Sequence, residues 1–270
     1  MKKKAACLLI AVIFTLCIFV SGCVETSMGS IEDTKTSQDT LYQVSTLDAL
    51  MQGVYDGEIT LNSLLDHGDF GIGTFNGLDG EMIVLDDTVY QALSSGEVVK
   101  AESADTTPFA MITDFDSDIQ DDVGDIDNYQ QLQSKIDALL PSQNIFYAIK
   151  VEGTFSNVQV RSVPKQSEPY PLLADVTSEQ QVYNYSDVSG ILVGFWCPAY
   201  IDGVNLPGYH MHFLSKDGSM GGHLLECTIK NTVIYIYTTT ELQMWLPENK
   251  HFLETDLSGV TDADKKDVEQ

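Results

Sequence analysis

Alternating apolar and polar positions, typical of strands, dominate the second half of the chain, whereas helical spacing of apolar residues is confined to short stretches. The expected helices cover residues 47–54, 60–65 and 132–140, and the last of them ends before Pro141. The glycine-dense segment 66–87 has the pattern of strand, turn and strand. This predominance of strands predicts the α+β class. The expected strands cover residues 41–44, 144–163 (two strands that meet at Glu152 and Gly153), 189–196, 209–214 and 232–237.

Three of the five histidines lie within one predicted hairpin, residues 208–227. With Asp217 and Gly218 as a two-residue loop, the register places His212 directly opposite His223, with Cβ atoms roughly 4.5–5.5 Å apart. His210 lies two residues before His212 and therefore points to the same face of the ribbon. A bulge at the adjacent pair of glycines, residues 221–222, would shift this register by one residue.

Three neutral imidazoles on one face are typical ligands of Zn²⁺, and a site with three protein ligands keeps a position open for water or substrate. Imidazole also suits copper, nickel and iron, so the pattern leaves the metal open. Three unrelated surface or core histidines are the alternative interpretation. The H-x-H spacing opposite a third histidine favours the metal site over that alternative.

The chain begins with a predicted secretory signal, residues 1–22, which has a basic start and an apolar run from Ala5 to Val20. Its end at Cys23 is similar to a prokaryotic lipobox, in which the cysteine becomes the lipidated first residue. Residues 23–40 are polar and read as a flexible tether, which leaves residues 41–270 as the folded domain. The predicted location is outside the cytoplasm, anchored by the lipid. An ordinary cleaved signal with a secreted product, or an uncleaved membrane anchor, are the alternatives.

Charge narrows the classes of partner. The chain has 40 acidic and 14 basic residues, a formal net charge of −26 at pH 7. Three of the basic residues lie in the predicted signal, which brings the mature chain near −29. This charge argues against a nucleic-acid partner and leaves the lipid as the expected contact with a membrane. Cys197 and Cys227 remain outside the signal, and the sequence leaves open whether they pair or stay as buried thiols.

Two further residues are candidates for chemistry. Glu81 opens the apolar run 82–85, where a carboxylate is most simply a surface residue unless a metal lies nearby. Arg161 is the single arginine of the chain, and its planar fork suits a carboxylate ligand or one of the many acidic side chains equally well. Seven aspartates in residues 111–130 lack the calcium-loop pattern and are expected to form a solvated loop.

From Leu41 onward, over nearly its whole length, the chain resembles the α-acetolactate decarboxylase family. The motifs that carry the resemblance are LYQVSTLDALMQGVYDGEITL (41–61), HGDFGIGTFNGLDGEM (67–82), FYAIKVEGTFSNVQVRSVP (146–164) and GYHMHFLSKDGSMGGHLLEC (208–227). The resemblance implies two closely packed subdomains with mixed and antiparallel sheets, and a homodimer.

The resemblance also implies a reaction, the zinc-dependent decarboxylation of 2-acetolactate to (R)-acetoin and CO₂ through a metal-stabilised enediolate, as in acetoin and butanediol formation. The chain would then be a carboxy-lyase. The residues that the family pattern assigns are zinc ligands at His210, His212 and His223, catalytic residues at Glu81, Arg161 and Glu269, and substrate binding at Thr74 and Arg161. Glu254 is the alternative to Glu269 for the glutamate of the tail.

Two other classes of protein stay open from the residues. One is a non-catalytic metal-binding surface lipoprotein, which would fill the fourth metal position with a protein ligand. The other is a different H-x-H metalloenzyme, such as a β-barrel oxygenase, which would add a carboxylate to the metal ligands.

Overall fold

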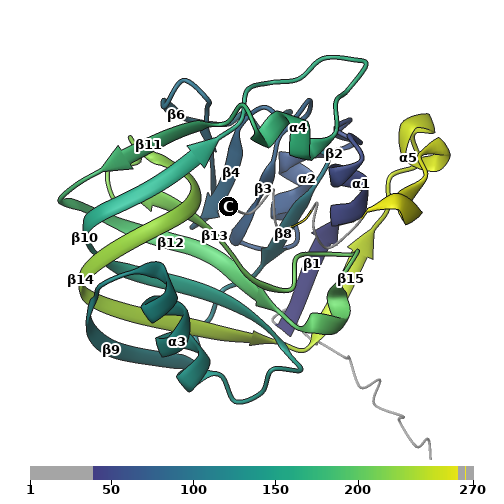
Figure 1. Ribbon diagram of the computed structural model, residues 1–270. Helices are drawn as coiled ribbons and strands as arrows, with labels where there is room; N and C mark the ends of the chain where they lie inside the picture. Colours follow the sequence, from purple (N-terminus) through teal and green to yellow (C-terminus); the bar gives the residue numbers. More distant parts are fainter. Residues whose placement is uncertain (1–38, 261–264, 266–270) are drawn as a thin grey trace, which may run out of the picture. The chain divides into compact units, whose positions relative to one another are not determined.

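Two β-sheets form the scaffold of the computed structural model, which describes residues 39–260 and Lys265 (Figure 1). The seven-stranded sheet has the order β15-β1-β8-β3-β4-β5-β6, and it is antiparallel except for the parallel pair β1 and β15. Its strands are β1 (Thr40–Val44), β3 (Phe70–Thr74), β4 (Glu81–Leu85), β5 (Thr88–Ala92), β6 (Val98–Lys100), β8 (Ala110–Thr113) and β15 (Glu241–Trp245).

The six-stranded sheet has the order β11-β10-β12-β13-β14-β9, and β10 also pairs with β14. These pairings close a ring of four strands, β10, β12, β13 and β14, which lies on the left of Figure 1. The strands are β9 (Ile119–Ile126), β10 (Phe146–Ser162), β11 (Gln181–Tyr185), β12 (Val188–Cys197), β13 (Gly208–Ser215) and β14 (Gly221–Thr239). A separate short pair is formed by β2 (Ile59–Thr60) and β7 (Thr106–Thr107).

The helices are short, and side chains at their starts explain where they begin. Thr46, Thr60 and Asn128 each accept a hydrogen bond from a backbone N–H of the first turn that follows, as expected of N-caps. Within the described residues, no helix combines the length and the apolar character needed to cross a bilayer. The helices are α1 (Leu47–Met51), α2 (Leu61–Leu65), α3 (Tyr129–Leu139), α4 (Leu173–Thr177) and α5 (Lys250–Glu254), with 3-10 turns η2 (Ala199–Ile201) and η3 (Leu257–Gly259).

The two sheets share a hydrophobic core. Phe70 and Ile72 of β3 belong to the same buried cluster as Val193 and Phe195 of β12. A second cluster lies under α3, whose Leu132 and Ile136 are fully buried. The predicted α+β class, with mixed and antiparallel sheets and few helices, is confirmed.

Three expectations differ from the structure in how far the strands extend. Residues 146–162 form one strand, β10, with a register shift between Glu152 and Thr154 where two strands were expected. Residues 232–237 belong to the long strand β14, also interrupted by register shifts. A bulge changes the phase of the alternation, so one bent strand looks like two in the sequence. The aspartate-rich segment includes strands β8 and β9 as well as solvated residues.

The structure tests the prediction for the two cysteines but not the predictions for the two ends of the chain. The signal, Cys23, the tether up to residue 38 and Glu269 lie outside the described residues, so the lipid anchor stays a prediction, as does the homodimer. Cys197 and Cys227 are buried free thiols in different core clusters. Burial raises the pKa of the Cys197 thiol to about 12, which keeps it protonated at neutral pH.

Candidate active site

The histidine hairpin forms with the predicted register. His212 on β13 pairs directly with His223 on β14, and the two neighbouring pairs continue the same register. The loop is longer than the predicted two residues, since the strands end at Ser215 and Gly221. The carboxylate of Asp217 accepts hydrogen bonds from Ser215 and Ser219, which stabilises this wider turn without moving the histidines.

The three imidazoles converge on one point. One ring nitrogen of each of His210, His212 and His223 lies within 4.8 Å of the corresponding nitrogens of the other two. His212 and His223 are buried, whereas His210 is partly exposed. The arrangement therefore presents three ring nitrogens to one position, open to solvent on the side of His210.

The protonation of His212 fits a metal ligand. Its Nδ1 donates to the carbonyl oxygen of Met82 at 2.8 Å, and because a carbonyl only accepts, the proton lies on Nδ1. The buried Nε2 makes no hydrogen bond and so presents a lone pair. Burial, followed by the charge of His223, lowers the pKa of His212 well below its usual value. Burial, followed by the charge of Arg161, does the same to the pKa of His223.

Strand register also positions Arg161. Residue 161 on β10 pairs with His223 on β14, which in turn pairs with His212 on β13. The alternative in which Gly222 forms a bulge between β13 and β14 is wrong, because the ladder of these two strands is regular there. A Cβ on Gly222 would lie 2.6 Å from the carbonyl oxygen of Arg161, so this glycine allows β10 and β14 to approach closely.

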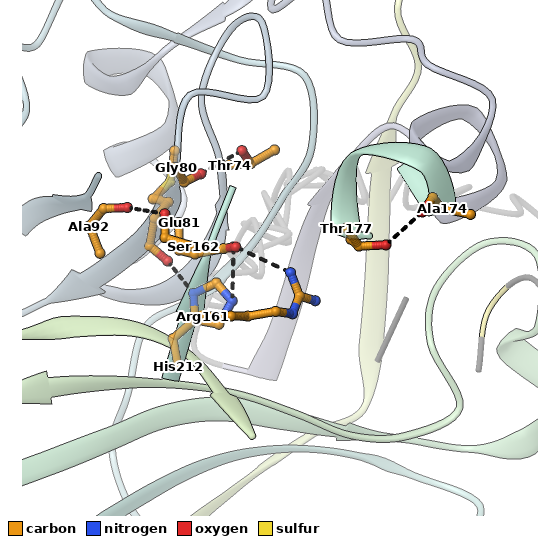
Figure 2. Close-up of polar contacts among 10 residues, drawn as sticks. Thr74, Gly80, Glu81, Ala92, Arg161, Ser162, Ala174, Thr177 and His212 are labelled. Atoms are coloured by element: carbon orange, nitrogen blue, oxygen red, sulfur yellow. Dashed lines mark hydrogen bonds and ion pairs between the residues drawn. The ribbon is translucent and has the colours of Figure 1, made fainter. Parts of the chain in front are cut away.

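Glu81 comes from the other sheet and faces this row of side chains. Its Oε1 lies 3.4 Å from Nη1 of Arg161, and its Oε2 lies 3.7 Å from Nε2 of His212. Both the glutamate and the arginine are buried, with side chains 9% and 5% exposed. Figure 2 shows the carboxylate between the guanidinium and the imidazole. Glu81 is therefore not the surface residue that its position before an apolar run most simply predicts, because it is buried beside the histidines.

Thr74 supports the position of Glu81. The two residues pair across β3 and β4, and the buried Thr74 hydroxyl donates to the carbonyl oxygen of Gly80 at 2.7 Å. Gly73 precedes Thr74, and a Cβ there would lie 2.4 Å from the carbonyl oxygen of Phe109. The close approach of β8 therefore requires glycine at this position.

Comparison with known proteins identifies the family. The family model described as alpha-acetolactate decarboxylase matches residues 41–259. The chain is 44% identical to the alpha-acetolactate decarboxylase of Methanosarcina mazei, over 87% of this chain and 81% of that protein. The chain belongs to the alpha-acetolactate decarboxylase family. It is therefore an enzyme, a carboxy-lyase.

Solved structures support the assignment to this family. The crystal structure of alpha-acetolactate decarboxylase from Bacillus subtilis strain 168 matches with a TM-score of 0.83 at 34% identity, covering 85% of this chain and 99% of that chain. A Staphylococcus aureus protein described as similar to alpha-acetolactate decarboxylase matches with a TM-score of 0.80 at 32% identity, covering 84% and 99%. The fold of this chain is thus the fold of the family.

Apolar side chains line the candidate site, an apolar wall that the sequence did not predict. The histidines, Glu81, Arg161 and Thr74 line one cavity together with apolar side chains from α1, α4 and the connecting loops. Leu47 and Leu50 looked like ordinary core positions of a helix, and nothing in their spacing distinguished them. The further lining residues are Leu47, Leu50, Gly73, Leu78, Phe109, Val163 and Leu173.

Neither glutamate proposed for the tail is found in this cavity: Glu254 lies elsewhere, and Glu269 is outside the described residues. Glu254 ends α5, is 68% exposed in its side chain, and lies 3.7 Å from Lys250 in an exposed ion pair. It lines a different cavity, together with Tyr170 and His251. Glu254 is therefore not brought to the histidines, and Glu269 lies among the residues that the structure does not describe.

Proposed function

We propose that the enzyme decarboxylates 2-acetolactate to (R)-acetoin and CO₂, with a zinc ion held by His210, His212 and His223. The observation that carries the proposal is the placement of three convergent imidazoles opposite a buried carboxylate and guanidinium. The names of the relatives support the substrate. Three ring nitrogens within 4.8 Å of one another, among them the unprotonated Nε2 of His212, fit Zn²⁺, and three protein ligands leave a position for substrate oxygen.

The reaction breaks the bond between carbon 2 and the carboxylate and leaves an electron pair on the rest of the substrate. This pair moves into the neighbouring ketone, so negative charge develops on oxygen. A divalent ion, when bound to the histidines, supplies a Lewis acid for that charge, an effect typically of several kcal/mol. The remaining requirements are to orient the carboxylate and to protonate carbon 2.

Arg161 orients the substrate carboxylate. Its guanidinium has five N–H donors in a planar fork, and one terminal nitrogen faces Glu81 at 3.4 Å. The fork binds a carboxylate through two parallel hydrogen bonds. Because Arg161 pairs with His223 in the strand register, this anion position lies beside the histidine nitrogens.

Glu81 transfers the proton. Its carboxylate lies beside Nε2 of His212. It is therefore close to the position that the three ring nitrogens face, where the substrate oxygens would bind. After CO₂ leaves, a protonated Glu81 delivers its proton to carbon 2 and becomes a carboxylate, which takes up a new proton from solvent. Because the side chain is held on one side of the cavity, the proton reaches one face of the substrate, which gives acetoin of one hand.

The apolar wall keeps bulk water out of the cavity during this step. Leu47, Leu50 and Phe109 are buried side chains of that wall. A dry environment strengthens the interactions of the ionic groups with the developing charge.

The experiment is to supply 2-acetolactate to the purified protein and measure CO₂ together with acetoin resolved by chiral chromatography. We expect equal amounts of both products, a single acetoin enantiomer, loss of activity on chelation and recovery with zinc. Glu81→Gln keeps the shape of the side chain but carries no transferable carboxyl proton, and we expect it to reduce kcat by about 100-fold or more. Wild-type protein that retains zinc and releases no CO₂ from this substrate contradicts the proposal.

A further inference from the structure

Lys265 forms short ion pairs with two aspartates that lie far from it in the sequence. Its Nζ lies 2.6 Å from Oδ1 of Asp202 and 3.1 Å from Oδ1 of Asp48. The lysine side chain is only 9% exposed, and among the described residues it is the one lysine that is buried. The chain has 40 acidic and only 14 basic residues, so few of its carboxylates can be paired with a buried cation as these two are.

The two aspartates belong to the segments that flank the proposed active site. Asp48 lies in the first turn of α1, between Leu47 and Leu50, both of which line the site cavity. Asp202 lies between η2 and β13, the strand that carries His210 and His212. Lys265 and Asp202 also line a cavity of about 940 Å³ whose wall includes His223.

Backbone contacts already bring these two segments together. The N–H of Leu47 donates to the carbonyl oxygen of Val204 at 2.9 Å, and that of Asp48 donates to the carbonyl oxygen of Gly203 at 3.2 Å. A Cβ on Gly203, which has a φ of +84°, would lie 3.0 Å from the Asp48 carboxylate. The carboxylate of Asp48 is therefore pressed against the loop that holds Asp202.

Lys265 offsets the repulsion that this contact creates. One nitrogen contacts an oxygen of each aspartate, so the two carboxylates are close to each other. Burial by itself lowers the pKa of Lys265, but the hydrogen bonds and charges of Asp202 and Asp48 outweigh burial and raise that pKa. Without the ammonium group, two like charges would lie across the contact between α1 and the loop, which would favour separation of the segments.

We propose that Lys265 is a positioning residue, which joins α1 to the loop before β13 and thereby holds the apolar wall against the histidine strand. This inference rests on the proposed function for its effects on catalysis and on zinc release, whereas its effect on hydrogen exchange in the metal-free protein does not. Lys265 acts through Asp48 and Asp202, and the structure places neither of the two aspartates in the site cavity.

The test uses the full chain with Lys265→Met, which keeps the length of the side chain and removes the charge. We expect kcat/KM on 2-acetolactate to fall about tenfold, and zinc to be released to a chelator about tenfold faster. In the metal-free protein we expect hydrogen exchange to rise about tenfold in residues 47–51 and 199–207. Strand β12 should keep its protection and serves as the internal reference.

Two further variants separate electrostatics from loss of the lysine itself. Lys265→Arg keeps the charge and should restore exchange, zinc release and kcat/KM to within about threefold of wild type. The triple variant Lys265→Met, Asp48→Asn, Asp202→Asn removes the repulsion between the two carboxylates. It should recover at least half of the protection from hydrogen exchange that Lys265→Met loses, measured as the logarithm of the exchange rate. The matched control is Lys250→Met, which removes an exposed lysine also paired with a carboxylate and should leave all three measurements unchanged.

Hydrogen exchange in the Lys265 variants decides whether the lysine holds the two segments together. Wild-type exchange in residues 47–51 and 199–207 of Lys265→Met overturns it. If Lys265→Met unfolds, the triple variant decides, because a triple variant that also unfolds shows that repulsion between the aspartates is not the cause. Wild-type protein inactive on 2-acetolactate would contradict the proposed function and leave the exchange test of Lys265 intact.

Discussion

The two sheets position the site residues by different means. In the six-stranded sheet, His212, His223 and Arg161 lie in one row across β13, β14 and β10, so ladder hydrogen bonds fix their spacing. Glu81 belongs to the seven-stranded sheet and reaches that row only through contacts between the sheets.

The contacts that join Glu81 to the row cross from one sheet to the other. They include the 3.4 Å ion pair with Arg161, the 3.7 Å approach to Nε2 of His212, and the 2.8 Å hydrogen bond from His212 to the carbonyl of the next residue, Met82. The placement of the histidines therefore depends on register, whereas the placement of Glu81 depends on packing between the sheets. Changes to the histidine row and changes at the contact between the sheets should consequently differ in what they abolish.

The largest effect is expected from removing a ligand in the row. His212→Ala should lose most of the bound zinc and lower kcat/KM by at least about 1,000-fold, corresponding to about 4 kcal/mol, because two ring nitrogens hold the ion weakly. The measurements are zinc content by elemental analysis and turnover of 2-acetolactate.

The matched control is His67→Ala, because His67 stacks on Tyr42 at a centroid distance of 3.6 Å and does not belong to the cluster. That variant should keep full zinc content. Full zinc content in His212→Ala would show that the histidine pair is not the metal site.

A smaller effect is expected at the contact between the sheets. Arg161→Lys keeps the positive charge but loses the planar fork, so zinc and fold should persist while kcat/KM falls by about 100-fold, roughly 3 kcal/mol. The measurements are kcat/KM, zinc content and the thermal midpoint. Lys165→Arg is the control, because Lys165 pairs with Asp79 at 3.2 Å and is 60% exposed.

The outcome for Arg161→Lys tests whether the two sheets contribute separately to function. Near wild-type turnover in Arg161→Lys would remove the arginine from substrate binding. Loss of zinc or unfolding would instead mean that the arginine stabilises the row itself, and the two sheets would then not be separable in function.

The smallest effect of one substitution, about 1.4 kcal/mol per pH unit, concerns how the stability of the metal-free protein depends on pH. Burial lowers the pKa of both His212 and His223, so below about pH 6.5 the unfolded chain takes up protons that the folded imidazoles do not. The free energy of unfolding should therefore fall as pH falls, by about 1.4 kcal/mol per pH unit for each of the two histidines. Denaturant unfolding between pH 5 and pH 7 measures the slope.

His212→Gln should reduce this slope. An unchanged slope in His212→Gln would show that the imidazole is not held neutral by its buried position. Addition of zinc should raise the stability of wild-type protein in the same pH range, because the ion binds the folded state.

The sequence predicted the parts of the site that depend on local spacing. The pairing of His212 with His223 follows from the positions of the two apolar runs around the turn, and it held although the loop is longer than expected. The identity of the family came from motifs distributed along the chain.

Spacing along the chain did not predict how distant segments meet. The continuous strands β10 and β14 looked like separate strands, because their register shifts change the phase of the apolar alternation. The aspartates of β9 looked like a loop, because that strand is largely exposed and lacks a clear apolar face. Both errors arise because periodicity reports burial of side chains and not backbone pairing.

Tertiary structure alone brought Glu81 to Arg161 and Lys265 to Asp48 and Asp202. Glu81 and Arg161 lie 80 residues apart in the sequence, and residues from two different sheets must pack before their charges meet. Each of these charged groups, taken alone in the sequence, is indistinguishable from a solvated one. The sequence by itself determined the row of histidines, since strand register is local, whereas sheet packing decided which acid and which cations face it.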